Sequence, residues 1–385
     1  MTYLDYNATT PIDQRVGRAL SAAYAEKFGN PSSRDHKFGW DSAEAVEDSR
    51  SQVSNLINTK PGEIIFTSCA TESVNLALKG IAQSRGSGGM TIISSVIEHK
   101  AVLETIRQLE RLGGVRVKLL PADRAGNIDL EEWKRHISSL SPALVALTLA
   151  NNEIGVINPI REVARMAHEA GALFFTDAAQ ALGKIPVDVQ ADGIDLAAFS
   201  AHKLYGPKGV GALFIRGGEP KIELEPLLAG GGQERGLRSG TLNAAGIIGF
   251  GEACRIAGEE MAQDAERMSR LRDNLERRLL SELPDVHING NPDNRLPNTS
   301  NMRFDGVDAR TLIRDMYVLA VSTSSACSSG AQGPSHVLKG LGLSDEQAYS
   351  SIRFSLGRFT TEEEIDRAVE LVTGSVRKLR QHRMR

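Results

Sequence analysis

Residues 200–211, Ser-Ala-His-Lys-Leu-Tyr-Gly-Pro-Lys-Gly-Val-Gly, follow the apolar run Ile-Asp-Leu-Ala-Ala-Phe at 194–199. The run has the length and composition of a buried strand, and the glycines and proline after it predict a tight bend. Lys203 stands at the exit of that strand. Partial burial in such a bend favours the neutral amine, which makes a lysine nucleophilic toward a carbonyl group. The alternative is an ordinary solvated surface lysine.

A carboxylate and an amide precede this lysine in the chain. The apolar segment 173–182 is predicted to form a strand that delivers Asp177 at its end, with Gln180 one turn later. Pyridoxal phosphate needs a carboxylate for its pyridine nitrogen, a hydrogen-bond partner for its phenolic oxygen and a lysine for its aldehyde. Asp177, Gln180 and Lys203 would supply these groups.

With these residues in this order, the chain resembles the cysteine desulfurases of the NifS and IscS type, which belong to the class V aminotransferase family of fold type I pyridoxal phosphate enzymes. The resemblance covers nearly the whole chain. It implies an α/β fold with a large domain on a mainly parallel seven-stranded sheet and a smaller α+β domain. We expect residues 14–260 to form the large cofactor-binding domain. Residues 1–13 and 261–385 would form the small domain, which carries the cysteine loop.

The hydrophobic pattern favours the same architecture. From residue 63 onward, short apolar runs alternate with helical patterns, which is typical of βαβ units in a mainly parallel sheet. A helical stretch at 243–283 with a charged middle predicts a connector between two domains. Ligands of such sheets bind outside the carboxyl ends of the strands, so the polar residues that follow those ends should share one crevice.

Length, charge and cysteine content limit the classes of protein to which the chain can belong. The chain has 385 residues and a formal net charge of −3, which is typical of a two-domain globular protein and implies no direct nucleic-acid binding. The amino terminus lacks a signal-peptide pattern, and no apolar run approaches the ~20 residues that cross a bilayer. We therefore expect a cytoplasmic protein without membrane contact. Cys69, Cys254 and Cys327 are too scattered for a disulfide framework or a metal site, and no metal is expected.

Several motifs are candidates for binding the cofactor and the substrate. Thr71 lies between a predicted strand and a helix, where free backbone N–H groups seat a phosphate, although a simple helix cap is the alternative. By resemblance, the cofactor would be bound by Ala70, Thr71, His99, Asn152, Asp177, Gln180, Ser200, His202 and Lys203. His99 would also stack on the ring and share proton transfers with Lys203, unless it is a structural histidine.

Two further residues complete the expected site. The resemblance places Thr241, in the glycine-rich stretch 230–241, at the cofactor phosphate of a neighbouring subunit, which requires a homodimer; a mobile surface loop is the alternative. Arg353 would grip the substrate carboxylate together with Asn152, because a guanidinium matches a carboxylate with two hydrogen bonds. A pairing of Arg353 with a surface acid is the alternative.

The stretch 322–330, Ser-Thr-Ser-Ser-Ala-Cys-Ser-Ser-Gly, surrounds Cys327 with small polar residues. Such a loop buries little apolar surface, so we expect it to be mobile and its thiol accessible. As a thiolate, Cys327 would attack the substrate sulfur, carry it as a persulfide and hand it to an acceptor protein. An inert surface cysteine is the alternative. Ser324 and Ala201 stand where relatives often have glycine.

The sequence therefore predicts a pyridoxal phosphate-dependent enzyme that converts L-cysteine to L-alanine, with Cys327, Lys203 and His99 as catalytic residues. The alternatives are a selenocysteine lyase, another pyridoxal phosphate-dependent lyase or aminotransferase, or a sulfur-relay interaction protein without turnover. A dinucleotide oxidoreductase is disfavoured because no GxGxxG follows the early strands. The sulfur is expected to serve iron–sulfur cluster assembly, tRNA thiolation or DNA phosphorothioation. The end of the chain at Arg385, without a longer tail, weakens the first destination.

Overall fold

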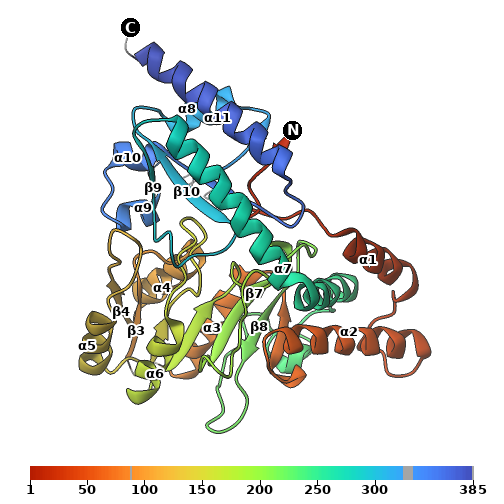
Figure 1. Ribbon diagram of the computed structural model, residues 1–385. Helices are drawn as coiled ribbons and strands as arrows, with labels where there is room; N and C mark the ends of the chain where they lie inside the picture. The colour runs from red at the N-terminus through yellow and green to blue at the C-terminus, as the bar shows by residue number, and fades with distance from the viewer. Residues whose placement is uncertain (87–88, 324–332, 384–385) are drawn as a thin grey trace.

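The structure is a computed structural model that describes residues 1–86, 89–323 and 333–383. Figure 1 shows a larger body in which helices surround a twisted sheet, with a smaller body above it that holds both chain ends. The long helix α7 (Ala244–Glu282) runs from one body into the other. The two bodies therefore meet at the edge of the large sheet where its parallel strands end.

The larger body is built on a seven-stranded sheet. Its strands are, in spatial order, β2 (Ile64–Thr67), β8 (Gly211–Ile215), β7 (Leu196–Ser200), β6 (Leu173–Asp177), β5 (Leu144–Ala146), β3 (Met90–Ser95) and β4 (Val115–Leu120). The strands from β7 to β4 are parallel to one another, whereas β8 runs antiparallel to both β7 and β2. The predicted mainly parallel seven-stranded sheet is confirmed.

Helices cover both faces of this sheet, so its central strands have no solvent-facing side. All residues of β3 and β7 are buried, as expected for strands without a solvent face. One face packs against α3 (Ala70–Ser84) and α4 (Lys100–Leu112). The opposite face packs against α2 (Lys37–Leu56), α5 (Leu130–Leu140), α6 (Ile160–Glu169) and the first half of α7.

The helix α7 has 39 residues and belongs to two hydrophobic cores. Ile247 and Phe250 pack into the core of the larger body, whereas Leu271 and Leu275 pack into that of the smaller body. The connector helix predicted at 243–283 is thus confirmed. The domain limits at 260 and 261 stay a prediction, since α7 passes through them without a break.

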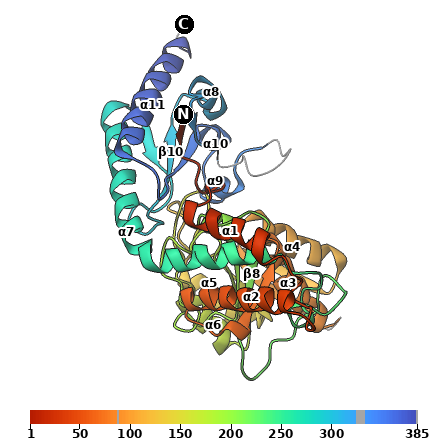
Figure 2. The same cartoon turned by 90° about the vertical axis from the view of Figure 1, so that its right-hand side faces the viewer.

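The smaller body contains a three-stranded antiparallel sheet covered by helices. Its elements are β9 (Val286–Ile288), β10 (Thr299–Phe304), α8 (Ala309–Asp315), β11 (Leu319–Ala320), α9 (His336–Gly340), α10 (Asp345–Tyr349), β12 (Ser351–Ser355) and α11 (Glu362–Arg383). The amino-terminal strand β1 (Thr2–Tyr3) pairs in parallel with β11. From there the arm runs down to α1 (Gln14–Glu26), as Figure 2 shows. The arm therefore passes between the two bodies.

Candidate active site

A cavity of about 340 Å³ opens where the carboxyl ends of the parallel strands face the smaller body. The predicted cofactor-binding residues that line it are Ala70, Thr71, His99, Asn152, Asp177, Gln180, Ser200, His202 and Lys203. Residues that lie far apart in the sequence meet here because parallel strands end at the same edge of a sheet. Their roles in catalysis stay predictions, but their convergence defines the candidate site.

Lys203 lies in the bend that follows β7, within the short 3₁₀ turn of Ala201–Lys203. Its Nζ donates hydrogen bonds to the backbone carbonyls of Asn7, at 2.5 Å, and Ala8, at 2.8 Å. The bend is tight because a Cβ on Gly206 would lie 2.8 Å from the carbonyl oxygen of Ala201. The methyl group of Ala201 is accommodated opposite this glycine. The half-buried amine is thus held at the cavity wall by the amino-terminal arm.

Asp177 occupies the end of β6, beside β7, and only 7% of it is exposed. Its Oδ1 accepts a hydrogen bond from the backbone N–H of Ala179 at 3.0 Å. The same turn brings Gln180 to the cavity wall. The carboxylate at the end of β6 and the lysine amine in the bend after the adjacent β7 therefore line the same cavity.

His99 caps the first turn of α4, which decides the position of its proton. Its Nδ1 accepts a hydrogen bond from the backbone N–H of Ala101 at 3.1 Å, so the neutral ring carries its hydrogen on Nε2. Burial lowers the pKa of His99, an effect that Asp177 opposes and that Lys203 reinforces. The ring is therefore neutral and presents a donor. His99 can accept a proton at Nδ1 only when the hydrogen bond from the backbone N–H of Ala101 is broken.

Ser200 and the first turn of α3 suit an anion. The hydroxyl of Ser200 is buried and has no hydrogen-bond partner among the residues that the structure describes. The cap residue of α3, Cys69, gives no side-chain hydrogen bond to the first turn, so the amides near Ala70 and Thr71 are not capped by it. Such amides attract a phosphate. An orphaned hydroxyl, uncapped helix amides and a buried carboxylate in one cavity fit the phosphate and the pyridine nitrogen of pyridoxal phosphate.

Arg353 lies in β12 and is fully buried, but it is not among the residues that line the cavity. Its Nη2 donates to Oδ1 of Asp5 at 2.8 Å and its Nη1 to the backbone carbonyl of Asn152 at 2.9 Å. The Nε of Arg353 has no partner within the described part of the chain. The predicted carboxylate-binding arginine thus stands directly behind Asn152.

Thr241 is exposed and does not line this cavity in its own chain. The glycine-rich loop that precedes it is fixed by Glu234, whose carboxylate accepts hydrogen bonds from Nη1 and Nη2 of Arg50, both at 2.8 Å, and from the backbone N–H of Phe66 at 2.6 Å. The loop therefore rests on β2 and α2, away from the site of its own chain.

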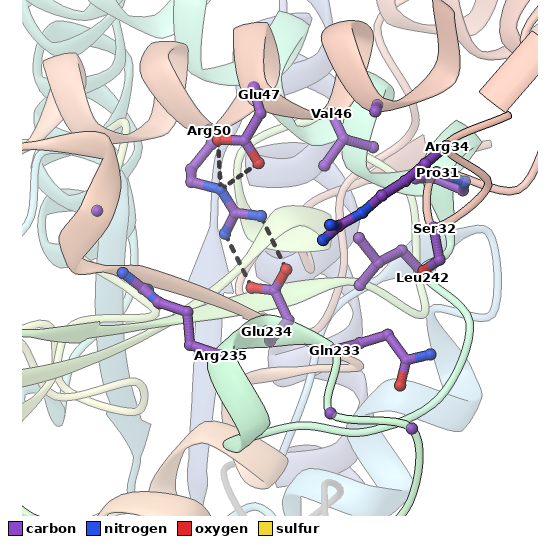
Figure 3. A pocket seen from close by; sticks show the side chains of 14 residues that line it. Pro31, Ser32, Arg34, Val46, Glu47, Arg50, Gln233, Glu234, Arg235 and Leu242 are labelled. Atoms are coloured by element: carbon purple, nitrogen blue, oxygen red, sulfur yellow. Dashed lines mark hydrogen bonds and ion pairs between the residues drawn. The ribbon is translucent and has the colours of Figure 1, made fainter. Parts of the chain in front are cut away.

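The same loop borders a larger cavity of about 670 Å³. Figure 3 shows the guanidinium of Arg50 between Glu47 and Glu234, with Arg34 extending toward them. None of the predicted catalytic or cofactor-binding residues of the described chain lines this cavity. Its size therefore does not make it the candidate active site.

Cys327 lies outside the described residues, but both flanks of its loop are placed. Ser322 exchanges backbone hydrogen bonds with Arg353, at 3.2 and 2.8 Å. On the other flank, His336 bonds through Nε2 to the backbone carbonyl of Glu98 at 2.9 Å. The two flanks thus attach beside the predicted substrate arginine and beside the residue that precedes His99.

Sequence reasoning did not single out several residues of the site. Asn7 is buried, and its backbone carbonyl accepts hydrogen bonds from both Lys203 and Gln180. Lys184 is buried and donates to Gln180. Glu98 is buried, burial raises its pKa well above the usual range, and its Oε1 accepts from the N–H of Thr148 at 2.6 Å. No spacing rule marks these residues, because each depends on chain segments that only the fold brings together.

Two kinds of feature are absent from the described residues. They contain no group of histidine, cysteine, aspartate or glutamate side chains that could hold a metal ion. No helix in the described ranges is both long and apolar enough to cross a membrane.

Comparison with known proteins gives consistent matches along the chain. The model of the family "Aminotransferase class-V" matches residues 2–368. A protein of Colwellia psychrerythraea strain 34H named "Cysteine desulfurase IscS" is 50% identical over 380 residues, which are 98% of this chain and 93% of the relative. A relative with the same name from Rickettsia bellii is 47% identical over 378 residues, 98% of this chain and 92% of the relative.

Solved structures agree with these matches. A structure named "NIFS-LIKE PROTEIN" superimposes with a TM-score of 0.90 at 39% identity and covers 98% of this chain and 100% of that chain. A structure described as "SspA in complex with cysteine" superimposes with a TM-score of 0.82 at 33% identity and covers 94% of this chain and 100% of that chain.

Proposed function

Since this chain belongs to the class-V aminotransferase family, and within it to the cysteine desulfurases, we propose that it converts L-cysteine to L-alanine with pyridoxal phosphate as its cofactor and collects the sulfur on Cys327. The observation that carries the proposal is the meeting of Lys203, Asp177, Gln180 and His99 in one cavity at the strand ends. A cytoplasmic location suits a reaction that depends on free thiols.

Each residue of the cavity has a role that follows from its chemistry. When bound, pyridoxal phosphate supplies an electron sink for a carbanion at the substrate Cα. In that complex Asp177 would lie at the pyridine nitrogen and keep it protonated, and Lys203 would bind the aldehyde group. The amine of Lys203 would also be the group of this cavity that moves the proton of the substrate Cα. The carbonyls of Asn7 and Ala8 are within 2.8 Å of its Nζ and hold it at the cavity wall.

His99 supports these proton transfers from the opposite element. His99 lines the cavity, and its hydrogen is on Nε2 because Nδ1 accepts the hydrogen bond that caps α4. Lys203 would therefore be the principal base, and His99 would orient the cofactor ring and stabilise negative charge that develops near that ring. The resemblance assigns the substrate carboxylate to Arg353 and Asn152; Asn152 lines the cavity, and Arg353 lies buried behind it, held by Asp5.

The transfer of sulfur to Cys327 needs no external oxidant or reductant. The Cys327 thiolate attacks the substrate sulfur, the new S–S bond forms, and the carbon–sulfur bond breaks with its electron pair left on Cβ. Protonation of that carbon gives alanine, and Cys327 retains a persulfide. One thiol and one cysteine therefore become one persulfide and one alanine. The persulfide sulfur then passes to an acceptor protein.

The proposal is tested with purified protein reconstituted with pyridoxal phosphate and supplied with L-cysteine. Alanine should form, and alkylation followed by mass spectrometry should locate the persulfide on Cys327. Cys327→Ser should lose the persulfide and most alanine formation while it keeps the cofactor absorbance. Cys254→Ala, which removes a buried thiol in α7, is the matched control and should retain both.

Three results would contradict the proposal in different ways. Full turnover by Cys327→Ser would favour a selenocysteine lyase or an aminotransferase. A persulfide on Cys69, which lines the cavity, would assign the sulfur to another thiol. No cofactor absorbance and no alanine would favour a sulfur-relay protein without turnover.

The acceptor is identified by the same chemistry. Trapping the Cys327 persulfide and capturing the protein that attacks it should recover a component of iron–sulfur cluster assembly, tRNA thiolation or DNA phosphorothioation. Because Thr241 is exposed on its own chain, we further propose that the enzyme is a homodimer in which this residue reaches the phosphate of the second copy.

A further inference from the structure

Lys184 is a buried lysine beside the cavity, and only 4% of it is exposed. It lies in the turn after β6, close to the lysine loop: a Cβ on the preceding Gly183 would lie 3.0 Å from Cβ of Leu204. Its Nζ donates hydrogen bonds to the backbone carbonyl of Gln180, at 3.0 Å, and to Oε1 of the same residue, at 2.9 Å. A lysine is rarely buried without a specific partner. Here the partner is a residue of the proposed cofactor site.

The contacts of Gln180 allow only one orientation of its amide. Oε1 accepts from Lys184, and Nε2 donates to the backbone carbonyl of Asn7 at 3.0 Å. Rotating the amide by half a turn would place Nε2 against the donor of Lys184 and Oε1 against the carbonyl of Asn7. Both hydrogen bonds would be lost in a buried place, where an unmade hydrogen bond is costly. Lys184 and Asn7 together therefore fix the amide.

We propose that Lys184 is a positioning residue that fixes the side-chain amide of Gln180 so that its Nε2 presents a donor to the phenolic oxygen of pyridoxal phosphate. This inference rests on the proposed function, because it assumes that the cofactor occupies the cavity. Lys184 itself does not line the cavity, whereas Gln180 does. Lys184 thus acts through Gln180 and not by touching the cofactor.

The electrostatics of the buried amine agree with this role. Burial lowers the pKa of Lys184 well below its usual range, and the charges of Lys203 and Arg353 lower it further. A neutral amine has two N–H groups, and the two oxygen atoms of Gln180 accept both. The neutral form, which burial favours, therefore has both of its N–H groups satisfied by Gln180.

The fixed donor has a measurable consequence. A hydrogen bond that donates to the phenolic oxygen of the cofactor stabilises the phenolate anion. It therefore lowers the pKa of the bound chromophore, in which this oxygen and a nearby nitrogen share a proton. If the amide loses its fixed orientation, Gln180 no longer favours the donor arrangement. The pKa of the bound chromophore should then rise. A lysine that only fills space would not affect that pKa.

The test is a pH titration of the visible absorbance of reconstituted holoenzyme. Lys184→Met, which keeps the length of the side chain but removes its donors, should raise the chromophore pKa by about one pH unit. Gln180→Leu should raise it by a similar amount, and the double variant should show no further shift. Lys184→Gln retains a donor and should return the pKa toward that of the parent. Lys208→Met, at an exposed position of the lysine loop, is the control and should show no shift.

The outcomes separate this inference from the function on which it rests. A parent protein that forms no chromophore contradicts the proposed function. A parent that forms one, with an unchanged pKa in Lys184→Met, overturns the positioning role. Additive shifts in the double variant overturn it as well, because Lys184 would then act by its charge. If Lys184→Met fails to fold, Lys184→Gln decides: a shift as large as that of Gln180→Leu contradicts the inference.

Discussion

Two glycine-rich loops, the lysine loop at 200–211 and the second loop at 230–241, look alike in the sequence but are held differently in the fold. Each contains non-glycine residues with positive φ: Tyr205 at 64° in the first, and Glu234 at 47° and Arg235 at 59° in the second. Such backbone strain persists only where the surrounding contacts impose it. Both loops are therefore fixed structures, and the difference between them is what they are fixed against.

The lysine loop is fixed between the two bodies. The Tyr205 hydroxyl accepts a hydrogen bond from the backbone N–H of Arg358, and the Arg358 guanidinium lies 4.6 Å from the centre of the Tyr205 ring. The second loop is held from within the larger body by Glu234 and Arg50, and it leaves Thr241 exposed. The first loop thus completes the cavity of its own chain. The second leaves Thr241 exposed, as the proposed homodimer requires.

The largest effect is expected within the lysine loop. Lys203→Ala should reduce alanine formation by about a thousandfold, because it removes both the cofactor linkage and the base. Lys208→Ala, five residues further and exposed, should change it little. Steady-state alanine formation at saturating cofactor measures both. Equal losses in the two variants would mean that the loop contributes general charge and no specific group.

Mixing two variant chains tests whether Thr241 of the second loop serves the site of the other subunit. Thr241→Val should weaken cofactor binding about tenfold, since it removes one hydrogen bond to a charged group. In a mixed dimer of Lys203→Ala and Thr241→Val chains, one of the two sites would hold both intact residues. At a limiting cofactor concentration, which fills the intact sites but few of the sites that lack Thr241, random mixing should therefore restore about a quarter of the parent activity. No recovery on mixing would place Thr241 outside the site of the second copy.

The ion pair between Arg50 and Glu234, which holds the second loop, predicts a change in stability. The side chains of Arg50 and Glu234 are 9% and 2% exposed, so Arg50→Met leaves a buried carboxylate without its cation. Loss of one partner of a buried pair should lower the free energy of unfolding by about 3 kcal/mol, measured by urea denaturation. Arg107→Met breaks an exposed pair with Glu104 and should cost at most about 0.5 kcal/mol. Similar losses in both would show that Glu234 does not depend on Arg50.

The smallest effect concerns a histidine of the lysine loop. Burial, with further contributions from Lys203 and Lys208, lowers the pKa of His202 to about 4. The unfolded chain then binds more protons than the folded one between pH 6.5 and pH 4, so the free energy of unfolding falls as the pH drops through that window. Above it this contribution is constant.

His202→Asn should therefore lose less stability between pH 7 and pH 5 than the parent does, with the urea midpoint as the measurement. Asn is the chosen substitute because it retains a polar atom for the hydroxyl of Thr9, which His202 contacts at 3.1 Å. Parallel pH profiles for the two proteins would show that His202 is not the group that titrates.

The sequence predicted the sheet and the strand ends well, because both follow from local pattern. Asp177, His99 and Lys203 were found because each follows an apolar run or a strand end, where ligands of parallel sheets bind. The contacts of Asn7 and Lys184 were not found, since an asparagine in an arm and a lysine in a turn look like surface residues. Arg353 is a prediction from the resemblance, and its burial behind Asn152 depends on the pairing of β10 with β12, which no local pattern specifies.

Lys203, and no other lysine of the cavity region, should bind the cofactor covalently. The experiment is to reduce the reconstituted protein with borohydride and to map the modified peptide by mass spectrometry. The cofactor mass should be added to Lys203 alone. Modification of Lys184, or of no lysine in a protein that still turns over cysteine, would contradict it.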